Sequence, residues 1–142
     1  MRCEDLMTSE VEIARAGEAV GEAARRMRDL NIGFLPICDD AEQLVGVITD
    51  RDIAMRVVAE DRQSNVAVED VMTEDVVTCR PDDESEQAEE LMRVNQIARL
   101  VCVDEGGKIA GVISLADIAQ YESELRAGEL VADVTEREAE VH

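Results

Sequence analysis

The stretch Gly46-Val47-Ile48-Thr49-Asp50-Arg51-Asp52 occurs a second time in the chain, as Gly111-Val112-Ile113-Ser114-Leu115-Ala116-Asp117, displaced by 65 positions. Each copy contains a glycine, two apolar residues, a hydroxyl residue and then an acid three residues further on. Ile-Ala follows both copies. An internal repeat is the first feature to establish, because it decides how the whole chain is divided.

The same displacement relates positions far from this stretch. Asp5-Leu6-Met7-Thr8 falls on Asp70-Val71-Met72-Thr73, and Met27-Arg28 falls on Met92-Arg93. No gap is needed between residues 5 and 54, and about a third of the aligned positions are identical, which chance explains poorly. The chain is therefore two copies of one unit of roughly 50 residues, joined by a linker and followed by a tail.

A unit of this size buries too little surface to be securely stable alone, so we expect the two units to pack together. The predicted domains are residues 1–64, residues 65–128 and an acidic C-terminal tail, 129–142. Each unit reads as strand, helix, strand, strand, helix, which predicts a mixed α/β (α+β) fold.

In the first unit, alternation predicts a strand over 11–14, and apolar residues at helical spacing predict a helix that opens at Gly17 and ends at Asn31. Residues 33–38 and 44–49 read as buried strands, and residues 50–60 as a helix. A short helical turn ending at Thr8 is expected before them.

The second unit repeats this order. We expect a strand over 76–79, a helix introduced by Pro81, a hairpin over 100–103 and 109–114, and a helix over 115–125 that Gly128 would end. The residues alone leave open whether the tail is a short helix or disordered.

The net charge of the 142 residues is −20. A chain this acidic would be repelled by nucleic-acid phosphates and by an anionic membrane surface. Neither is therefore expected as a partner. No run is long enough to span a bilayer and no basic-then-apolar leader is present, so we expect a cytoplasmic protein.

Four cysteines, Cys3, Cys38, Cys79 and Cys102, show no spacing typical of a metal site, and the one histidine is the last residue. No metal site and no histidine-dependent catalysis is expected. Cys79 and Cys102 fall on strands that could be neighbours, which leaves a redox-sensitive disulfide or two buried thiols open. Cys3, near the terminus, is predicted to be the most reactive thiol.

The repeated stretch places a hydroxyl residue, Thr49 or Ser114, where a helix begins. The hydroxyl can cap free backbone N–H groups, or leave them to an anion such as phosphate. Asp52 and Asp117 follow one turn later, where a carboxylate can accept hydrogen bonds from the two hydroxyls of a ribose. Arg51 can pair with phosphate. Simple helix capping remains the alternative role for Thr49, Ser114, Asp52 and Asp117.

Together with Met7-Thr8, Met72-Thr73 and Leu35-Pro36-Ile37, these stretches make the chain resemble a pair of CBS domains, the Bateman module named after cystathionine β-synthase. The resemblance covers residues 5 to about 125. Residues 31–38 and 49–53 also resemble the small stand-alone members that include the hypoxic response proteins.

The resemblance implies two β-α-β-β-α units packed sheet to sheet about a pseudo-twofold axis, with two clefts between them. Such clefts bind adenosine-containing ligands, among them AMP, ADP, ATP, S-adenosylmethionine and NAD-type molecules. Asp52 and Asp117 would hold the ribose, Thr49 and Ser114 would face ribose or phosphate, and Arg51 would pair with phosphate. The residues implied around the base are Ile13, Ala14, Gly33, Phe34, Leu35, Pro36, Thr78, Cys79, Ala98, Arg99, Leu100 and Val101.

The two copies are not equivalent. The second has Leu115-Ala116 in place of Asp50-Arg51, and Arg99 in place of Phe34. Arg99 could reach a phosphate in a shared cleft or be a solvated side chain. We therefore expect unequal affinities at the two sites.

These features favour a non-enzymatic regulatory sensor that binds an adenine nucleotide, requires no cofactor, forms a homodimer and acts on a separate protein. A ligand-free scaffold for protein interaction or stress response is the alternative. An enzyme is the least favoured reading, because the sequence has no nucleophile–base pair and no P-loop.

Overall fold

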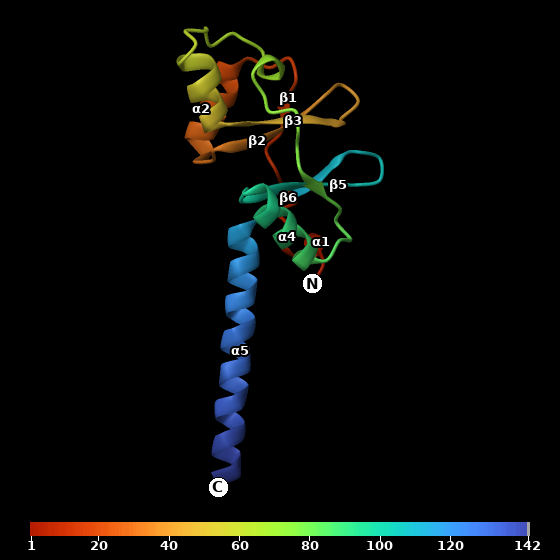
Figure 1. The fold of residues 1–142 in the computed structure, drawn as a ribbon, viewed down its shortest axis with the longest axis vertical. Helices are drawn as coiled ribbons and strands as arrows, with labels where there is room; N and C mark the ends of the chain where they lie inside the picture. The colour runs from red at the N-terminus through yellow and green to blue at the C-terminus, as the bar shows by residue number, and fades with distance from the viewer. Residues whose placement is uncertain (142) are drawn as a thin grey trace.

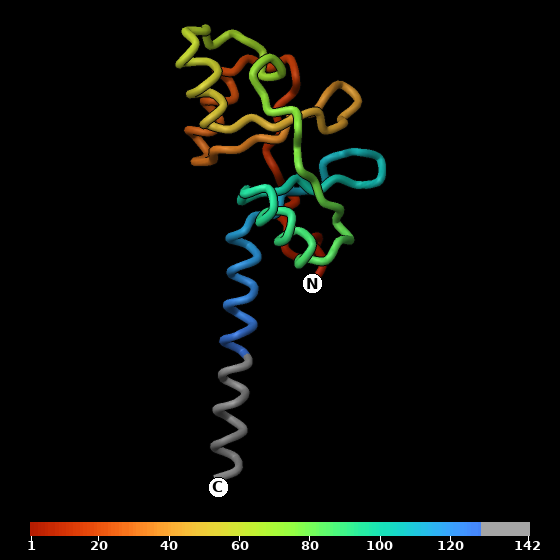
Figure 2. The backbone as a smooth tube through the Cα atoms, viewed as in Figure 1, coloured from red at the N-terminus to blue at the C-terminus, as the bar shows by residue number. Residues whose placement is uncertain are grey.

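The computed structural model describes the backbone of residues 1–141 and the side chains of residues 1–128. Two small units of sheet and helix lie one beside the other, and a long C-terminal helix extends from the second (Figure 1). The path of the chain between them is followed most easily in Figure 2. This is the predicted mixed α/β fold with two repeated units.

The first unit is built on a three-stranded sheet of order β1-β2-β3, in which β1 pairs with β2 in parallel and β2 with β3 antiparallel. Its last α-helix continues directly into a π-helical stretch, so that residues 50–58 form one helical segment where the sequence predicts 50–60. The elements are β1 (Ala14–Arg15), α2 (Val20–Leu30), β2 (Phe34–Cys38), β3 (Leu44–Thr49), α3 (Asp50–Ile53) and η1 (Ala54–Val58).

The second unit repeats this sheet in the order β4-β5-β6, again with one parallel and one antiparallel pair. A short 3₁₀ turn precedes it. The elements are η2 (Val68–Asp70), β4 (Thr78–Cys79), α4 (Ser85–Asn95), β5 (Arg99–Val103), β6 (Ile109–Ser114) and α5 (Leu115–Val141).

Each unit is completed by a segment from the other sequence repeat. Thr8 and Val112 exchange two backbone hydrogen bonds of 2.8 and 3.0 Å, and Thr73 and Val47 exchange an equivalent pair of 2.8 and 3.0 Å. Because residues 8 and 73 match in the repeat, as do 47 and 112, the two bridges are related by exchange of the units. The exchange is the pseudo-twofold relation that the family resemblance implies.

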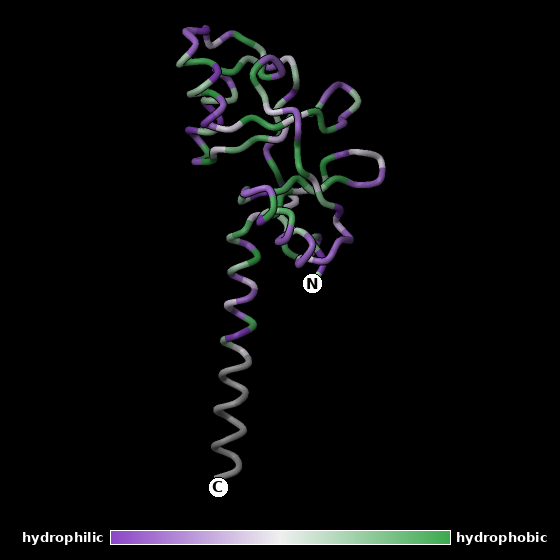
Figure 3. The backbone as a smooth tube through the Cα atoms, in the orientation of Figure 1, coloured by the Kyte–Doolittle hydropathy of each residue, from purple (hydrophilic) through white to green (hydrophobic). Residues whose placement is uncertain are grey.

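The hydrophobic cores follow the exchange rather than the sequence order. Helix α1 (Cys3–Leu6) packs beside α4 and α5 of the second unit, and η2 packs into the first. Apolar residues concentrate along the strands in both units (Figure 3). The first core contains Ala14, Val20, Ala23, Met27, Leu35, Ile37, Ile48, Val57, Val68 and Val71; the second contains Cys3, Cys79, Ala88, Met92, Leu100, Cys102, Ile113 and Ile118.

Because of this exchange, the predicted sequence units do not coincide with the two packed cores of the structure. Cys3, Leu6 and Met7 belong to the first unit in sequence but pack with the second core. The reverse holds for Val66, Val68, Val71 and Met72, which pack with the first core. The division of the chain at residue 64 stays a prediction about sequence units. The inward-facing Met27 and Met92 are confirmed as core residues.

Both central helices end in a residue with left-handed backbone conformation. Asn31 has φ 54° and ψ 48°, and the matched residue Gln96 has φ 54° and ψ 47°. Their backbone N–H groups donate to carbonyls of the last helical turn, which satisfies acceptors that the helix would otherwise leave open. The predicted end of the first helix at Asn31 is confirmed.

Several predicted boundaries are wrong. Strand β1 begins at Ala14 rather than Val11, because only Ala14 and Arg15 are in register with β2. Helix α2 begins at Val20 rather than Gly17. Helix α1 ends at Leu6, before Thr8 joins β6. Helix α5 continues to Val141 through Gly128, so this glycine does not end it. No helix within the described residues is both long and apolar enough to cross a membrane.

All four cysteines are buried and unbonded. The Sγ atoms of Cys79 and Cys102 are 3.2 Å apart, on strand residues that face each other in the parallel pair β4–β5. Cys3 is fully buried, and this burial raises the pKa of its thiol from 9.0 to about 12. The prediction that Cys3 is the most reactive thiol is wrong, because α1 folds into the second core.

Candidate functional site

The repeated stretch forms the same capping box at two helix starts. In the first copy, the Thr49 hydroxyl accepts the backbone N–H of Asp52 at 3.1 Å, and the Asp52 carboxylate accepts that of Thr49 at 3.0 Å. In the second copy, Ser114 and Asp117 make both bonds at 3.0 Å. The capping role that the sequence left open is therefore real. It fixes the orientation of both acids at the ends of β3 and β6.

Asp52 has further partners beyond its capping box. The Thr73 hydroxyl lies 3.2 and 3.3 Å from its two carboxylate oxygens, and Nε of Arg56 lies 3.8 Å from Oδ1. Asp52 as a whole residue has a relative exposure of 9%, so it is buried, and its carboxylate is largely satisfied by these partners. Asp117 is half-buried, and in the described part of the chain its carboxylate accepts only from the backbone of Ser114. The two matched acids thus differ in the acceptor capacity that they offer a ligand.

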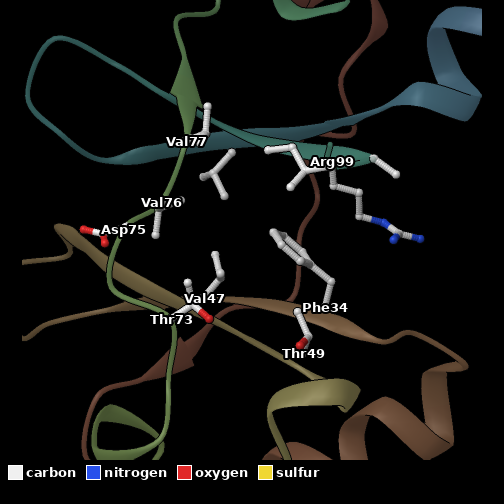
Figure 4. Close-up of a pocket in the computed structure, with 11 residues that line it drawn as sticks. Phe34, Val47, Thr49, Thr73, Asp75, Val76, Val77 and Arg99 are labelled. Carbon is white, nitrogen blue, oxygen red and sulfur yellow. The ribbon is translucent and has the colours of Figure 1, made fainter. Parts of the chain in front are cut away.

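A first cleft lies where the Thr49 end of the first sheet meets the second unit (Figure 4). Its volume is about 310 Å³ and its lining is mostly apolar. The ring of Phe34 lies between the two sheets, and the Arg99 guanidinium points away from Asp75. The lining residues are Phe34, Val47, Thr49, Thr73, Asp75, Val76, Val77, Ile97, Ala98, Arg99 and Val101.

A second cleft occupies the matched position on the other side of the pseudo-twofold relation. It has a volume of about 520 Å³ and more polar residues in its wall. It combines the Ser114–Asp117 capping box with segments that flank α2 of the first repeat. The lining residues are Thr8, Glu10, Val11, Glu12, Leu30, Asn31, Ile32, Gly33, Phe34, Arg99, Val112, Ser114 and Asp117.

Both clefts are composite. Each joins the hydroxyl residue at the strand end of one repeat to the segments before the first and second strands of the other repeat. Phe34 and Arg99, which occupy matched positions, line both clefts. A ligand in either cleft would therefore touch both units at once.

Eight of the predicted site residues line the two clefts: Thr49, Gly33, Phe34, Ala98, Arg99, Val101, Ser114 and Asp117. Asp52 lies next to the first cleft, because it is hydrogen-bonded to two of the lining residues, Thr49 and Thr73. Their contact with a ligand stays a prediction.

The other predicted site residues lie elsewhere. Ala14, Leu35, Pro36, Cys79 and Leu100 are buried and line neither cleft. Thr78 is half-buried on β4, outside both linings, and Arg51 is exposed on the surface of α3. Ile13 lines a separate cavity beside Arg15 and Lys108. The strands begin later than predicted, so residues 10–12 and 75–77 occupy the cleft walls expected of Ile13–Ala14 and Thr78–Cys79.

Sequence reasoning missed the lining residues Thr8 and Thr73. Both belong to the repeated Met-Thr pairs, which was the available signal, but nothing local indicates that each crosses to the other unit. Within the residues whose side chains are described, no group of three or more His, Cys, Asp or Glu side chains is placed to hold a metal ion.

Comparison with known proteins agrees with this architecture. The CBS domain family model matches twice, over residues 3–59 and 68–124. The uncharacterized protein YlbB of Bacillus subtilis (strain 168) is 34% identical over 137 residues, which cover 95% of this chain and 92% of YlbB. The chain belongs to the CBS domain family.

Two solved structures illustrate the similarity. Hypoxic Response Protein I, solved with two coordinated zinc ions, has a TM-score of 0.78 at 27% identity, covering 84% of this chain and 98% of that one. The CBS domain pair of protein MJ0100, in complex with 5′-methylthioadenosine and S-adenosyl-L-methionine, has a TM-score of 0.77 at 27% identity, covering 87% and 97%.

Proposed function

We propose that this protein is a non-enzymatic regulatory module that binds an adenosine-containing ligand in the clefts between its two units. The observation that carries the proposal is the pair of composite clefts, each lined by the capping-box hydroxyl of one repeat and by apolar residues of the other. The acid of the capping box lines the second cleft, as Asp117, and lies next to the first, as Asp52. An apolar wall suits a purine base, and an acid suits the two ribose hydroxyls. The adenosine ligands in the similar CBS pair of MJ0100 support this choice.

Regulation would follow from the composite construction. A ligand that contacts both units stabilises the arrangement of the units in which both contacts are made. The size of this effect is limited by the difference in its affinity for the two arrangements. The output would be read by a separate protein, and ATP, ADP or AMP could serve as the signal.

A homodimer is part of the proposal. Several large apolar side chains are exposed on helical segments, with Val58 at 68%, Val94 at 65% and Met55 at 56%. Their burial between two copies would be favourable. A net charge of −20 disfavours nucleic acid and anionic membranes as partners. A cytoplasmic location fits a nucleotide signal.

A ligand-free scaffold is the second candidate, and one observation favours it for the first cleft. Thr73 and Arg56 already occupy the carboxylate of Asp52, so a ribose would have to displace or share these partners. In the second cleft, the Asp117 carboxylate has no such side-chain partner among the described residues, so a ribose would have none to displace.

Thermal unfolding of the full chain with AMP, ADP, ATP, S-adenosylmethionine and NADH tests the proposal. A ligand at a hundredfold excess over Kd stabilises the folded state by about 2.7 kcal/mol, which raises the Tm by roughly 5 to 10 °C. Asp52→Asn and Asp117→Asn keep the side-chain volume and remove the charge. A rise that one of them abolishes supports the proposal, whereas no rise with any ligand favours the scaffold.

A further inference from the structure

Building on the proposed function, we infer that the two clefts take adenosine-containing ligands of different charge. The second cleft selects a ligand whose 5′ substituent is neutral or cationic, such as a thioether or a sulfonium. Phosphate-bearing ligands bind in the first cleft. The inference rests on the charges that line the two matched cavities.

Three carboxylates and one guanidinium line the second cleft. Glu10, Glu12 and Asp117 supply the acids, and Arg99 the base. At the matched positions of the first cleft, Asp75 replaces Glu10 and the apolar Val77 replaces Glu12. The first cleft is thus lined by one acid and one base.

The acids of the second cleft are poorly neutralised by their neighbours. Glu10 is exposed, and it forms no ion pair or hydrogen bond with any other residue whose side chain is described. Glu12 lies 3.2 Å from Arg26, but the same guanidinium lies 2.7 Å from Glu18. One cation therefore serves two carboxylates, and negative charge remains at the cleft wall.

The first cleft differs because Asp75 is the one acid in its lining, and the capping-box acid next to it is already balanced. Asp52 is buried, bonded to Thr73 and paired with Arg56, so it adds little free negative charge. Arg99 forms no ion pair among the described residues and lines both clefts, where it is accompanied by one acid in the first lining and by three in the second. A phosphate group entering the second cleft would meet several carboxylates, which repel it, whereas a sulfonium there would be attracted.

Titration calorimetry of the full chain with ATP and with S-adenosylmethionine tests this assignment, using two variants at matched positions. Glu10→Gln removes one acid of the second cleft, and Asp75→Asn removes the acid of the first. Both side chains are exposed, so neither change threatens the fold. Asp117→Asn and Asp52→Asn assign each ligand to a cleft.

We expect Glu10→Gln to weaken S-adenosylmethionine binding about two- to fivefold while leaving ATP binding unchanged. Asp75→Asn is expected to tighten ATP binding by a similar factor without affecting S-adenosylmethionine. Higher salt should reduce both effects, since the side chains are exposed. Asp117→Asn should abolish binding of S-adenosylmethionine but not of ATP.

Three outcomes would overturn the inference while leaving the proposed function intact. These are S-adenosylmethionine binding that survives Asp117→Asn, ATP binding that is lost in Asp117→Asn but kept in Asp52→Asn, and equal responses of both ligands to Glu10→Gln. If none of ATP, ADP, AMP, NADH, S-adenosylmethionine and 5′-methylthioadenosine binds the wild-type chain, the proposed function fails and this inference fails with it.

Discussion

The hydroxyl of Thr73 lies 3.2 Å from Oδ1 of Asp52, and this hydrogen bond joins the start of the second repeat to the motif of the first. The matched pair, Thr8 and Asp117, lines the second cleft without such a bond between them in the described structure. One half of this pseudo-symmetric protein thus has a side-chain contact that the other half lacks in the described structure. The asymmetry is the basis of the first prediction.

Thr73→Val should lower the free energy of unfolding by about 1 to 2 kcal/mol, because a buried carboxylate loses a hydrogen-bond donor while the side-chain shape is retained. Urea denaturation measures the change. The matched substitution Thr8→Val removes no such bond and should change stability by less than about 0.5 kcal/mol. Equal effects of the two substitutions would show that the contact with Asp52 contributes nothing.

The two capping boxes should contribute equally to stability. Thr49→Val and Ser114→Ala each remove a hydroxyl that accepts the N–H of the third helical residue, at 3.1 and 3.0 Å. Loss of such a cap costs about 1 kcal/mol. Chemical denaturation of the two variants should show similar losses. A negligible loss at either position would mean that solvent replaces the hydroxyl there without cost.

Stability should fall as the pH rises above about 9. Burial raises the pKa of the Cys3 thiol from 9.0 to about 12, so the unfolded chain releases this proton at a lower pH than the folded chain does. The stabilisation is therefore complete below pH 9 and is lost between pH 9 and 12, with a slope of up to about 1.4 kcal/mol per pH unit.

Denaturation at several alkaline pH values, compared between wild type and Cys3→Ala, isolates the contribution of this thiol from other groups that titrate there. The variant should show a shallower decline. Identical slopes would place the Cys3 thiol in contact with water, against the packing of α1 in the second core.

Arg99→Gln should weaken the binding of ATP about three- to tenfold, since Arg99 is a cation without an ion pair among the described residues and lines both clefts. Calorimetric titration measures the affinity. Arg28→Gln is the control, because Arg28 is exposed on α2 and lines neither cleft. Equal affinities for Arg99→Gln and wild type would make Arg99 a solvated side chain only.

The repeat itself allowed the architecture to be predicted. A shared displacement of the motif and of the Met-Thr pairs predicts two like units, and helical spacing around Met27 and Met92 correctly identifies core residues. Helix ends were harder to predict from the sequence. Gln96, for example, adopts a left-handed backbone conformation that is not typical of glutamine. Gly128 was wrongly predicted to end the last helix, because glycine is typical of helix ends, yet α5 continues through it. An exposed helix tolerates a glycine at a cost of about 1 kcal/mol.

The candidate site could be predicted only in part. The hydroxyl and acid residues of the motif are visible in sequence, but the cleft wall opposite each of them comes from the other repeat. That pairing depends on the exchange of Thr8 and Thr73 between units, which is a long-range contact with no local signal. For the same reason, the sequence could not show that the Thr73 hydroxyl is hydrogen-bonded to the Asp52 carboxylate. Nor could it show that the matched Asp117 carboxylate has no such side-chain partner in the described structure.

The most direct test of the central claim is a crystal structure of the protein grown with a saturating concentration of the adenosine ligand that gives the largest rise in Tm. The account predicts density in a cleft between the units, with both ribose hydroxyls within hydrogen-bonding distance of the Asp117 or Asp52 carboxylate and the base against the apolar wall of the opposite repeat. Ligand density elsewhere on the protein, or two empty clefts, would contradict it.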